Sequence, residues 1–231
     1  MKQENRELMI RRTELPSRPE GLMLRMSAQR SLWIIALAVC FAAGCGASHP
    51  IKYYQLTVPG NPPTANANPI PITLLIGRMT APALYREDQI VYGTGGEGMG
   101  VYEYHRWSEP PTEMISEVMV RQFRASGHYR GVYTLRSDIR GDYLLHGHLY
   151  DLKEVDAGSL VARVTMELEL RNIKTGTTVW THFYTHDEPA AAKTTDAIVA
   201  ALDKGVQQGV AEVRAGLEEY FAANPPKQDA P

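Results

Sequence analysis

The sequence predicts an α+β fold in which a mostly antiparallel sheet packs against two main helices. Residues 160–172 alternate apolar and polar side chains over their whole length, which is typical of a strand with one buried and one solvated face. Two other stretches carry apolar residues at spacings of three and four, which is typical of a helix with one buried side. Because strands precede a helix twice, we expect two related halves.

The composition is that of an ordinary globular protein. The chain has 231 residues, 44% of them hydrophobic and 22% charged, which suffices for one domain with terminal extensions. The formal net charge of -2 gives no reason to expect a nucleic-acid partner. Both cysteines, Cys40 and Cys45, lie in an N-terminal apolar segment. The predicted domain therefore has neither a disulfide nor a thiolate metal site, and we expect packing to stabilise it.

Residues 31–44 form an apolar run with the pattern of a signal peptide. Arg25 and Arg30 precede the run, and the small residues Ala42, Ala43 and Gly44 end it. A basic region, an apolar region and a small-residue cleavage region in this order are typical of an export signal. The run is shorter than the roughly 20 residues that a membrane-spanning helix needs. We therefore expect it to be cleaved.

The first 24 residues do not suit the basic region of a signal peptide, because they carry four glutamates. A start at Met23 or Met26 would give an ordinary export signal. We therefore interpret residues 1–44 as a mis-assigned extension plus the signal peptide, and leave open whether Met1, Met23 or Met26 is the first residue.

The cleavage region resembles a bacterial lipobox, in which small residues precede a cysteine that takes lipid on its sulfur. Cys45 stands at that position, and Ala42 replaces the leucine that is usual three residues earlier. The resemblance implies several acyl chains, palmitate among them, and stable anchoring needs more than one chain. Gly46 follows where many inner-membrane lipoproteins carry aspartate, which favours the outer membrane and a domain facing the periplasm. The alternative is an ordinary secretory signal with a chance cysteine.

Two segments outside the predicted domain have compositions that do not favour folding. Residues 45–69 are rich in Pro, Asn and Ala apart from an apolar patch at residues 51–56, and we interpret them as a tether with an early edge segment. Residues 224–231 are polar, and we expect a disordered tail. The predicted domain therefore spans residues 70–223.

The first half of this domain begins with three short strands. Residues 72–76 and 89–92 are apolar runs suited to buried strands, and residues 101–105 alternate as a third strand. The glycine cluster Gly93–Gly100 separates the last two, and we interpret it as a hairpin tip whose further role is left open.

A helix completes the first half. Pro110 and Pro111 begin it, at the first turn where missing N–H groups cost least, and Gly127 ends it. Its expected buried stripe is Met114, Ile115, Val118, Met119 and Phe123.

The second half repeats the order of strands and helix. Residues 143–155 and 160–172 are predicted long strands, residues 174–177 supply a hairpin turn, and residues 178–186 form the returning strand. A long helix begins at about Ala190. Its expected buried stripe is Ile198, Leu202, Val206, Val210, Val213, Leu217, Tyr220 and Phe221.

Four motifs follow Cys45 in order: Tyr-Tyr-Gln-Leu at 53–56, Ile-Val-Tyr at 90–92, Tyr-His-Arg-Trp-Ser-Glu-Pro-Pro at 104–111 and Gly-His-Leu-Tyr at 147–150. Together with the lipobox they resemble the ABC-type transport auxiliary lipoprotein family of the PqiC/YmbA type. The Arg-Trp-x-x-Pro-Pro pattern after a strand is the strongest of them. The glycine cluster departs from the family, where a shorter link is expected.

The resemblance implies an outer-membrane lipoprotein that works with an MCE-domain periplasmic protein and its ABC transporter in moving lipids between the two membranes. A homo-oligomer is left open. Four residues near the corner between the third strand and the helix are candidates for binding the partner: Tyr92, Tyr104, Arg106 and Trp107. Tyr, Trp and Arg are enriched in protein-binding sites, although aromatic residues at such a corner also pack in cores.

The sequence carries weak signals for chemistry. His146 and His148, and likewise His182 and His186, share a strand face, but no cysteine or carboxylate accompanies them in sequence, so we interpret them as polar positions on solvated faces. The glycine cluster precedes a strand rather than a helix that could bind phosphate. No Gly-x-Ser-x-Gly motif is present. We therefore expect no enzyme, no metal and no cofactor.

The alternative function is a lipoprotein that itself binds a small or lipidic ligand in an apolar pocket between helices and sheet.

Overall fold

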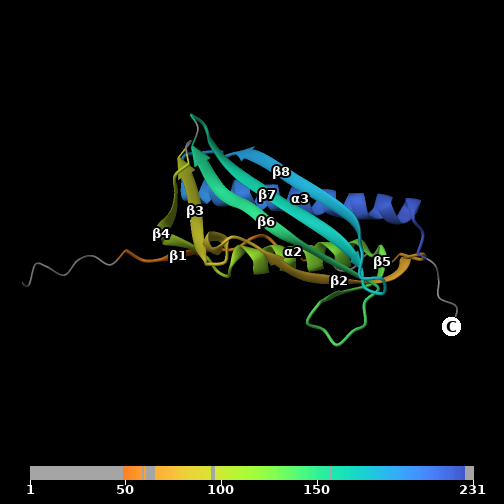
Figure 1. The fold of residues 1–231 in the computed structure, drawn as a ribbon. Coiled ribbons are helices and arrows are strands. Elements are labelled where there is room, and N and C mark those ends of the chain that lie inside the picture. The colour runs from red at the N-terminus through yellow and green to blue at the C-terminus, as the bar shows by residue number, and fades with distance from the viewer. Residues whose placement is uncertain (1–48, 59, 61–65, 95–96, 157, 227–231) are drawn as a thin grey trace, which may run out of the picture. The chain divides into compact units, whose positions relative to one another are not determined.

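A computed structural model of the chain describes residues 49–58, 60, 66–94, 97–156 and 158–226, and Cys45 lies outside these residues (Figure 1). The described part contains an eight-stranded mixed sheet with two long helices, which confirms the α+β prediction. The strands are β1 (Lys52–Tyr54), β2 (Ile70–Thr80), β3 (Gln89–Thr94), β4 (Met99–Trp107), β5 (Tyr129–Thr134), β6 (Tyr143–Asp156), β7 (Leu160–Asn172) and β8 (Thr178–Pro189). The helices are α2 (Pro111–Ser126) and α3 (Thr195–Ala223), and the short 3-10 helix η1 (Ala83–Tyr85) precedes β3.

Strand β6 lies at the centre of the sheet. Strand β7 pairs antiparallel with one of its edges along the whole length, and β8 continues the sheet beyond β7. On the other edge, β2 pairs with the first half of β6 and β3 with the second half, both in parallel. Strand β5 then adds to β2, and β4 followed by β1 adds to β3.

The sheet is less antiparallel than the sequence predicts. The long ladder β6–β7–β8 is antiparallel, as expected from its alternating pattern. Four of the seven pairings, however, are parallel: β1–β4, β2–β5, β2–β6 and β3–β6. The short apolar runs in β2 and β3 are buried on both faces, which suits parallel strands. Periodicity alone does not reveal the direction of pairing.

Both helices lie on the same face of the sheet, behind it in the view of Figure 1. Helix α2 begins at the predicted prolines, and Gly127 ends it in the left-handed conformation with φ 66°. Helix α3 begins five residues after the predicted Ala190, because β8 continues to Pro189 and Thr194 supplies the cap. The Thr194 Oγ1 accepts a hydrogen bond from the Ala197 N–H at 3.2 Å.

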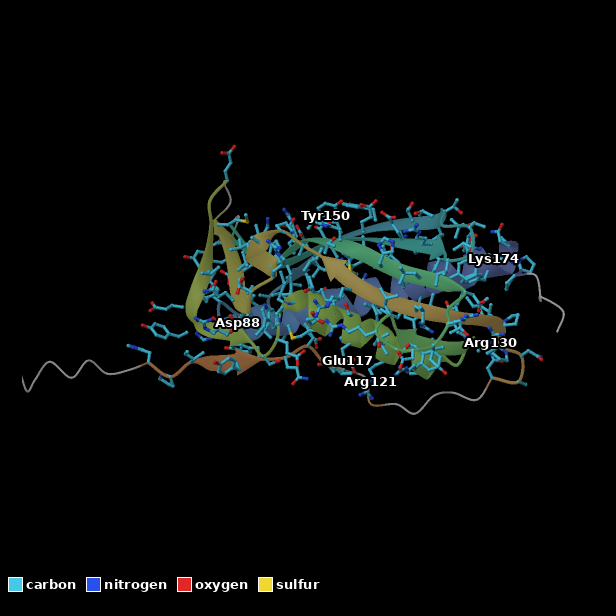
Figure 2. The ribbon with its side chains drawn as sticks, turned by 60° about the horizontal axis from the view of Figure 1, so that its bottom comes forward. Asp88, Glu117, Arg121, Arg130, Tyr150 and Lys174 are labelled. Carbon is cyan, nitrogen blue, oxygen red and sulfur yellow. The ribbon has the colours of Figure 1, made fainter. Side chains whose placement is uncertain are left out.

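The core fills the layer between helices and sheet. The apolar side of β7 meets the buried stripe of α3, and glycines allow the close approach. A Cβ atom on Gly209 would lie 2.5 Å from Met166 Cε and 2.7 Å from the Tyr184 ring. The Tyr184 hydroxyl donates a hydrogen bond to the Gly205 carbonyl at 2.8 Å. The opposite face of the sheet is open, and Tyr150 lies on it (Figure 2).

Two folded segments differ from the sequence prediction. Strand β5 was not predicted, because Arg130 and Gly131 interrupt its apolar pattern. The ordered domain also begins before residue 70: β1 pairs with β4, and Leu56 is only 1% exposed. The apolar patch at residues 51–56, predicted as an early edge segment within the tether, forms the edge strand β1 and a buried contact at Leu56.

Gly147 in β6 is a position where the fold leaves no room for a side chain. A Cβ atom there would collide with the Glu167 carbonyl oxygen and with Leu168 of β7. We expect Gly147→Ala to lower the free energy of unfolding by about 2 kcal/mol, measured by denaturant titration. Gly60→Ala is the control, because a Cβ atom on Gly60 has no neighbour within 4 Å among the described residues. Equal stability of the two variants would contradict this packing.

Candidate functional site

The four candidate partner-binding residues lie at the β1–β4 end of the sheet. Tyr92 belongs to β3, and Tyr104, Arg106 and Trp107 belong to β4. Strand β1 pairs with the last residues of β4, and the N-terminus of α3 lies beside β1. The structure therefore brings the four residues into one region but gives them different surroundings.

Trp107 and Arg106 are held in the strand-to-helix corner. Trp107 is 0% exposed, and its backbone N–H donates to the Asp88 carbonyl at 2.6 Å. Arg106 Nη1 donates to the Asp88 carboxylate at 2.9 Å in a half-buried ion pair. The Ser108 N–H donates to the Tyr54 carbonyl at 2.7 Å. Trp107 is therefore a core residue, and Figure 2 shows Asp88 at this end of the domain.

The two tyrosines are more accessible. Tyr104 is 38% exposed, and its ring centre lies 5.2 Å from that of His49. Tyr92 is half-buried and packs against Tyr102 with ring centres 5.0 Å apart. Of the four candidates, Tyr104 offers the most exposed aromatic surface, and partner binding by any of them stays a prediction.

Residues 52–57, here called the strap, lie along the first turns of α3. The Lys52 ammonium donates to both oxygens of the Asp196 carboxylate at 2.6 and 2.8 Å. The Tyr54 hydroxyl donates to the same carboxylate at 2.7 Å. These bonds join residues more than 140 positions apart in the chain, so no local pattern could have predicted them.

The strap continues beyond the first turn of the helix. The Thr57 N–H donates to the Asp203 carboxylate at 2.9 Å, and Gln207 Nε2 donates to the Thr57 carbonyl at 2.6 Å. Leu56 is buried between these attachments. The side chains of Asp203 and Gln207, which lie one helical turn apart, thus hold the backbone of the strap on α3.

The charges in the strap support this attachment. Hydrogen bonds from Lys52 first, and then from Tyr54, hold the pKa of Asp196 below its ordinary value. The same contact with Asp196 raises the pKa of Lys52, and burial followed by Asp196 raises the pKa of Tyr54. At neutral pH the carboxylate and the ammonium are therefore charged, and the phenol keeps its proton.

His105 and Tyr102 extend this polar cluster. His105 Nδ1 lies 2.8 Å from the Tyr54 oxygen. Because the single Tyr54 proton goes to Asp196, the His105 nitrogen is the donor in this contact. Tyr102 donates to the Glu154 carboxylate at 2.7 Å, and burial followed by this bond raises the pKa of Tyr102 well above its ordinary value. The phenols here act as hydrogen-bond donors, not as bases.

His182 and His186 each have a carboxylate neighbour that the sequence did not indicate. His182 lies 2.9 Å from a Glu212 oxygen, and His186 lies 3.0 Å from a Glu188 oxygen. Within the described ranges, no three His, Cys, Asp or Glu side chains converge in a way that could hold a metal ion.

Comparison with known proteins identifies the family. A family model described as ABC-type transport auxiliary lipoprotein component matches residues 54–214. The chain belongs to the ABC-type transport auxiliary lipoprotein family. The match begins within the strap and ends in α3, so it includes all four candidate residues and the strap contact between Tyr54 and Asp196.

Solved structures share the fold of this auxiliary lipoprotein. A crystal structure from Xanthomonas campestris has 24% sequence identity and a TM-score of 0.62, covering 70% of this chain and 92% of that chain. An uncharacterised protein has 14% identity and a TM-score of 0.58, covering 73% of this chain and 99% of that chain. A search of curated proteins gave no match. In the part of this lipoprotein that the structure describes, no helix has the length and apolar character needed to cross a membrane.

The stability of two alanine variants tests which residues at this corner belong to the core. We expect Trp107→Ala to lower the free energy of unfolding by about 3–5 kcal/mol, because the change leaves a cavity. Tyr104→Ala, three residues away on the same strand, should change it by less than about 0.5 kcal/mol. Thermal and denaturant unfolding measure both variants, and a stable Trp107→Ala protein would contradict the packing of the corner.

The contact between Lys52 and Asp196 can be removed by mutation or by low pH, and both changes should loosen the strap in the same way. We expect Asp196→Asn to speed amide hydrogen exchange in residues 52–57 at pH 7, because the charged partner of Lys52 is lost. The pKa of Asp196 is lowered by folding, so the contact is present above the ordinary value of 3.8 and is lost as pH falls through the lower folded value.

Wild-type exchange, corrected for the intrinsic effect of pH, should therefore rise only below about pH 3.8. Asp156→Asn, an exposed carboxylate at the end of β6, is the control. An unchanged exchange rate in Asp196→Asn would contradict the role of this contact.

Proposed function

We propose that this lipoprotein is a membrane-anchored adaptor of an MCE-type ABC transport system. Lipid on Cys45 would hold it at the outer membrane with its domain in the periplasm. The domain would dock on an MCE-domain protein that works with the ABC transporter in moving lipids between the membranes. Family membership supports the transport role, and the lipobox-like sequence before Cys45 supports the anchor.

The strap is the observation that carries this proposal. Lys52, its first residue, follows Cys45 by seven positions, which span at most about 25 Å when fully extended. A lipid on Cys45 would thus keep the β1–β4 end of the domain close to the membrane. Because the strap is bonded to α3, the anchor would constrain the position of the folded domain and not only that of a loose tether.

The structural features favour an adaptor over an enzyme. The polar cluster near the strap holds charges and phenols in stable hydrogen bonds, and its tyrosine pKa values are raised, which does not suit a base. Exposed Tyr104 remains our candidate for a partner contact near the membrane, with the less exposed Tyr92 and Arg106 in the same region.

The ligand-carrier alternative receives less support. A cleft of about 520 Å³ lies between α2 and the β2–β5 region, but Arg78, Glu113, Glu117 and Arg136 are among the residues that line it. Sites for lipidic ligands are predominantly apolar. Figure 2 shows Glu117 beside Arg121 on this helix.

The anchor is tested by Cys45→Ala. We expect this variant to stay unprocessed or to leave the outer membrane, because the acyl chains would be missing. Membrane fractionation with radiolabelled palmitate measures both outcomes, and Cys40→Ala is the matched control. Equal labelling and equal outer-membrane recovery of Cys45→Ala and wild type would rule out the proposed anchor.

The partner is tested by capture from membrane extracts. The wild-type lipoprotein should retain an MCE-domain protein. Tyr104→Ala, which should stay folded but lacks the candidate contact, should retain less of it. If the wild type captures neither an MCE-domain protein nor an ABC transporter subunit, the adaptor role is wrong.

A further inference from the structure

Strand β8 is an open edge of the sheet. Among the described residues it pairs only with β7, and the register of that ladder is regular from Trp180 to Pro189. Proteins protect such edges with short strands, bulges, proline or charged side chains. Between Trp180 and His186 the strand has no proline, lysine, arginine or carboxylate. The edge strands β1 and β5 are only three and six residues long, and β8 carries protective residues only at its end, at Asp187, Glu188 and Pro189, so residues 180–186 form the longest edge stretch without them.

A groove of about 540 Å³ lies between this edge and the C-terminal part of α3. Trp180 forms part of its wall and stacks on His182 with ring centres 5.6 Å apart. Small residues of α3 leave the space open, and a Cβ atom on Gly216 would already lie 3.0 Å from Trp180. Because side chains alternate along a strand, a strand added to β8 would direct every second side chain into this groove.

The charge of the groove is acidic. Glu212 and Glu219 line it, and among the described residues no lysine or arginine does so. Glu212 lies against His182, whereas Glu219 is exposed and has no ion pair in the described part of the chain. A ligand segment with a cationic side chain would complement these two carboxylates.

The open face beside the edge carries one exposed aromatic pair among polar side chains. Phe183 is 59% exposed, and its ring centre lies 6.1 Å from that of Tyr150. A strand added to β8 would cover Phe183 with a side chain on that face, since directly paired residues lie about 5 Å apart.

We propose that the β8 edge and this groove bind an extended segment of a partner protein by strand addition. The segment would hydrogen bond to the free backbone groups of β8, place an apolar side chain over Trp180, and direct a lysine or arginine to Glu219. This inference rests on the adaptor function and names a second contact, apart from the candidate at Tyr104, by which the adaptor holds a partner.

The chain's own C-terminal segment does not suit this edge, and the place of the groove suits a separate partner. The segment that follows α3 leaves from the groove at Ala223, but it continues as Asn224, Pro225 and Pro226, and prolines have no N–H to donate to an edge. The groove also lies away from the strap: 20 residues of α3 separate Asp196 from Gly216, about 30 Å along the helix. It would therefore face a partner at the end opposite the lipid.

The test uses the lipidated full-length protein in detergent and, as the probe, a synthetic nonapeptide whose groove-facing positions alternate between valine and lysine, with threonine at every position between them. We expect the peptide to slow amide hydrogen exchange in residues 178–189. The same peptide with glutamate for lysine, or with a central proline, should not do so. Glu219→Lys should weaken the protection by the lysine peptide at least tenfold, and Ala215→Trp, which fills the groove from an exposed position, should abolish it. Glu117→Lys, the same charge change on α2, is the matched control.

The proposal is overturned if the lysine peptide leaves the exchange of β8 unchanged, if the glutamate peptide protects equally, or if Glu117→Lys weakens binding as much as Glu219→Lys. The proposal is also overturned, in favour of a second copy of this chain, if β8 becomes protected without peptide as the protein concentration rises and the protein then has twice the mass of the monomer. Failure of the peptide test with intact capture of an MCE-domain protein would remove this site alone, whereas failure of capture concerns the adaptor function.

Discussion

The pairing of β6 with three neighbours is the constraint on which the rest of the structure depends. Its full-length ladder with β7 positions β7, which together with β8 forms the surface that α3 covers, and its opposite edge holds β2 and β3 end to end. Gly147 permits close contact with β7 in the middle of that ladder. Because β3 is fixed by the second half of β6, the β4 corner and the strap have a defined place beside the N-terminus of α3.

Helix α3 connects the two surfaces for which we propose functions, the strap and the groove beside β8. Its first turns bind the strap through Asp196 and Asp203, and its last turns form one wall of the groove beside β8. A helix is stiff over this length, so the two ends keep a fixed separation. In our account, the lipid-bearing end stays near the membrane and the groove projects from it toward a partner.

Much of the fold could be predicted from the sequence, because long elements carry periodic patterns. Strand β7 has the predicted bounds, and α2 begins and ends at the residues that proline and glycine indicate. Strand β5 was missed because Arg130 and Gly131 interrupt its apolar pattern, whereas the parallel pairings and the attachment of the strap to α3 were missed for a common reason. They depend on contacts between distant segments, such as Lys52 with Asp196, and neither partner shows a local signal. Trp107 was a candidate because its residue type suits an interface, but its burial depends on how the strands around it pack.

The orientation of the domain relative to the membrane tests this account most directly. The only cysteine expected in the mature chain carries the lipid, so single cysteines at Tyr53→Cys and Ala223→Cys can be labelled selectively with a fluorophore. With the lipidated protein on vesicles that contain a quencher in their headgroup layer, the account predicts strong quenching at residue 53 and weak quenching at residue 223. Equal quenching at both positions, or stronger quenching at residue 223, would contradict it.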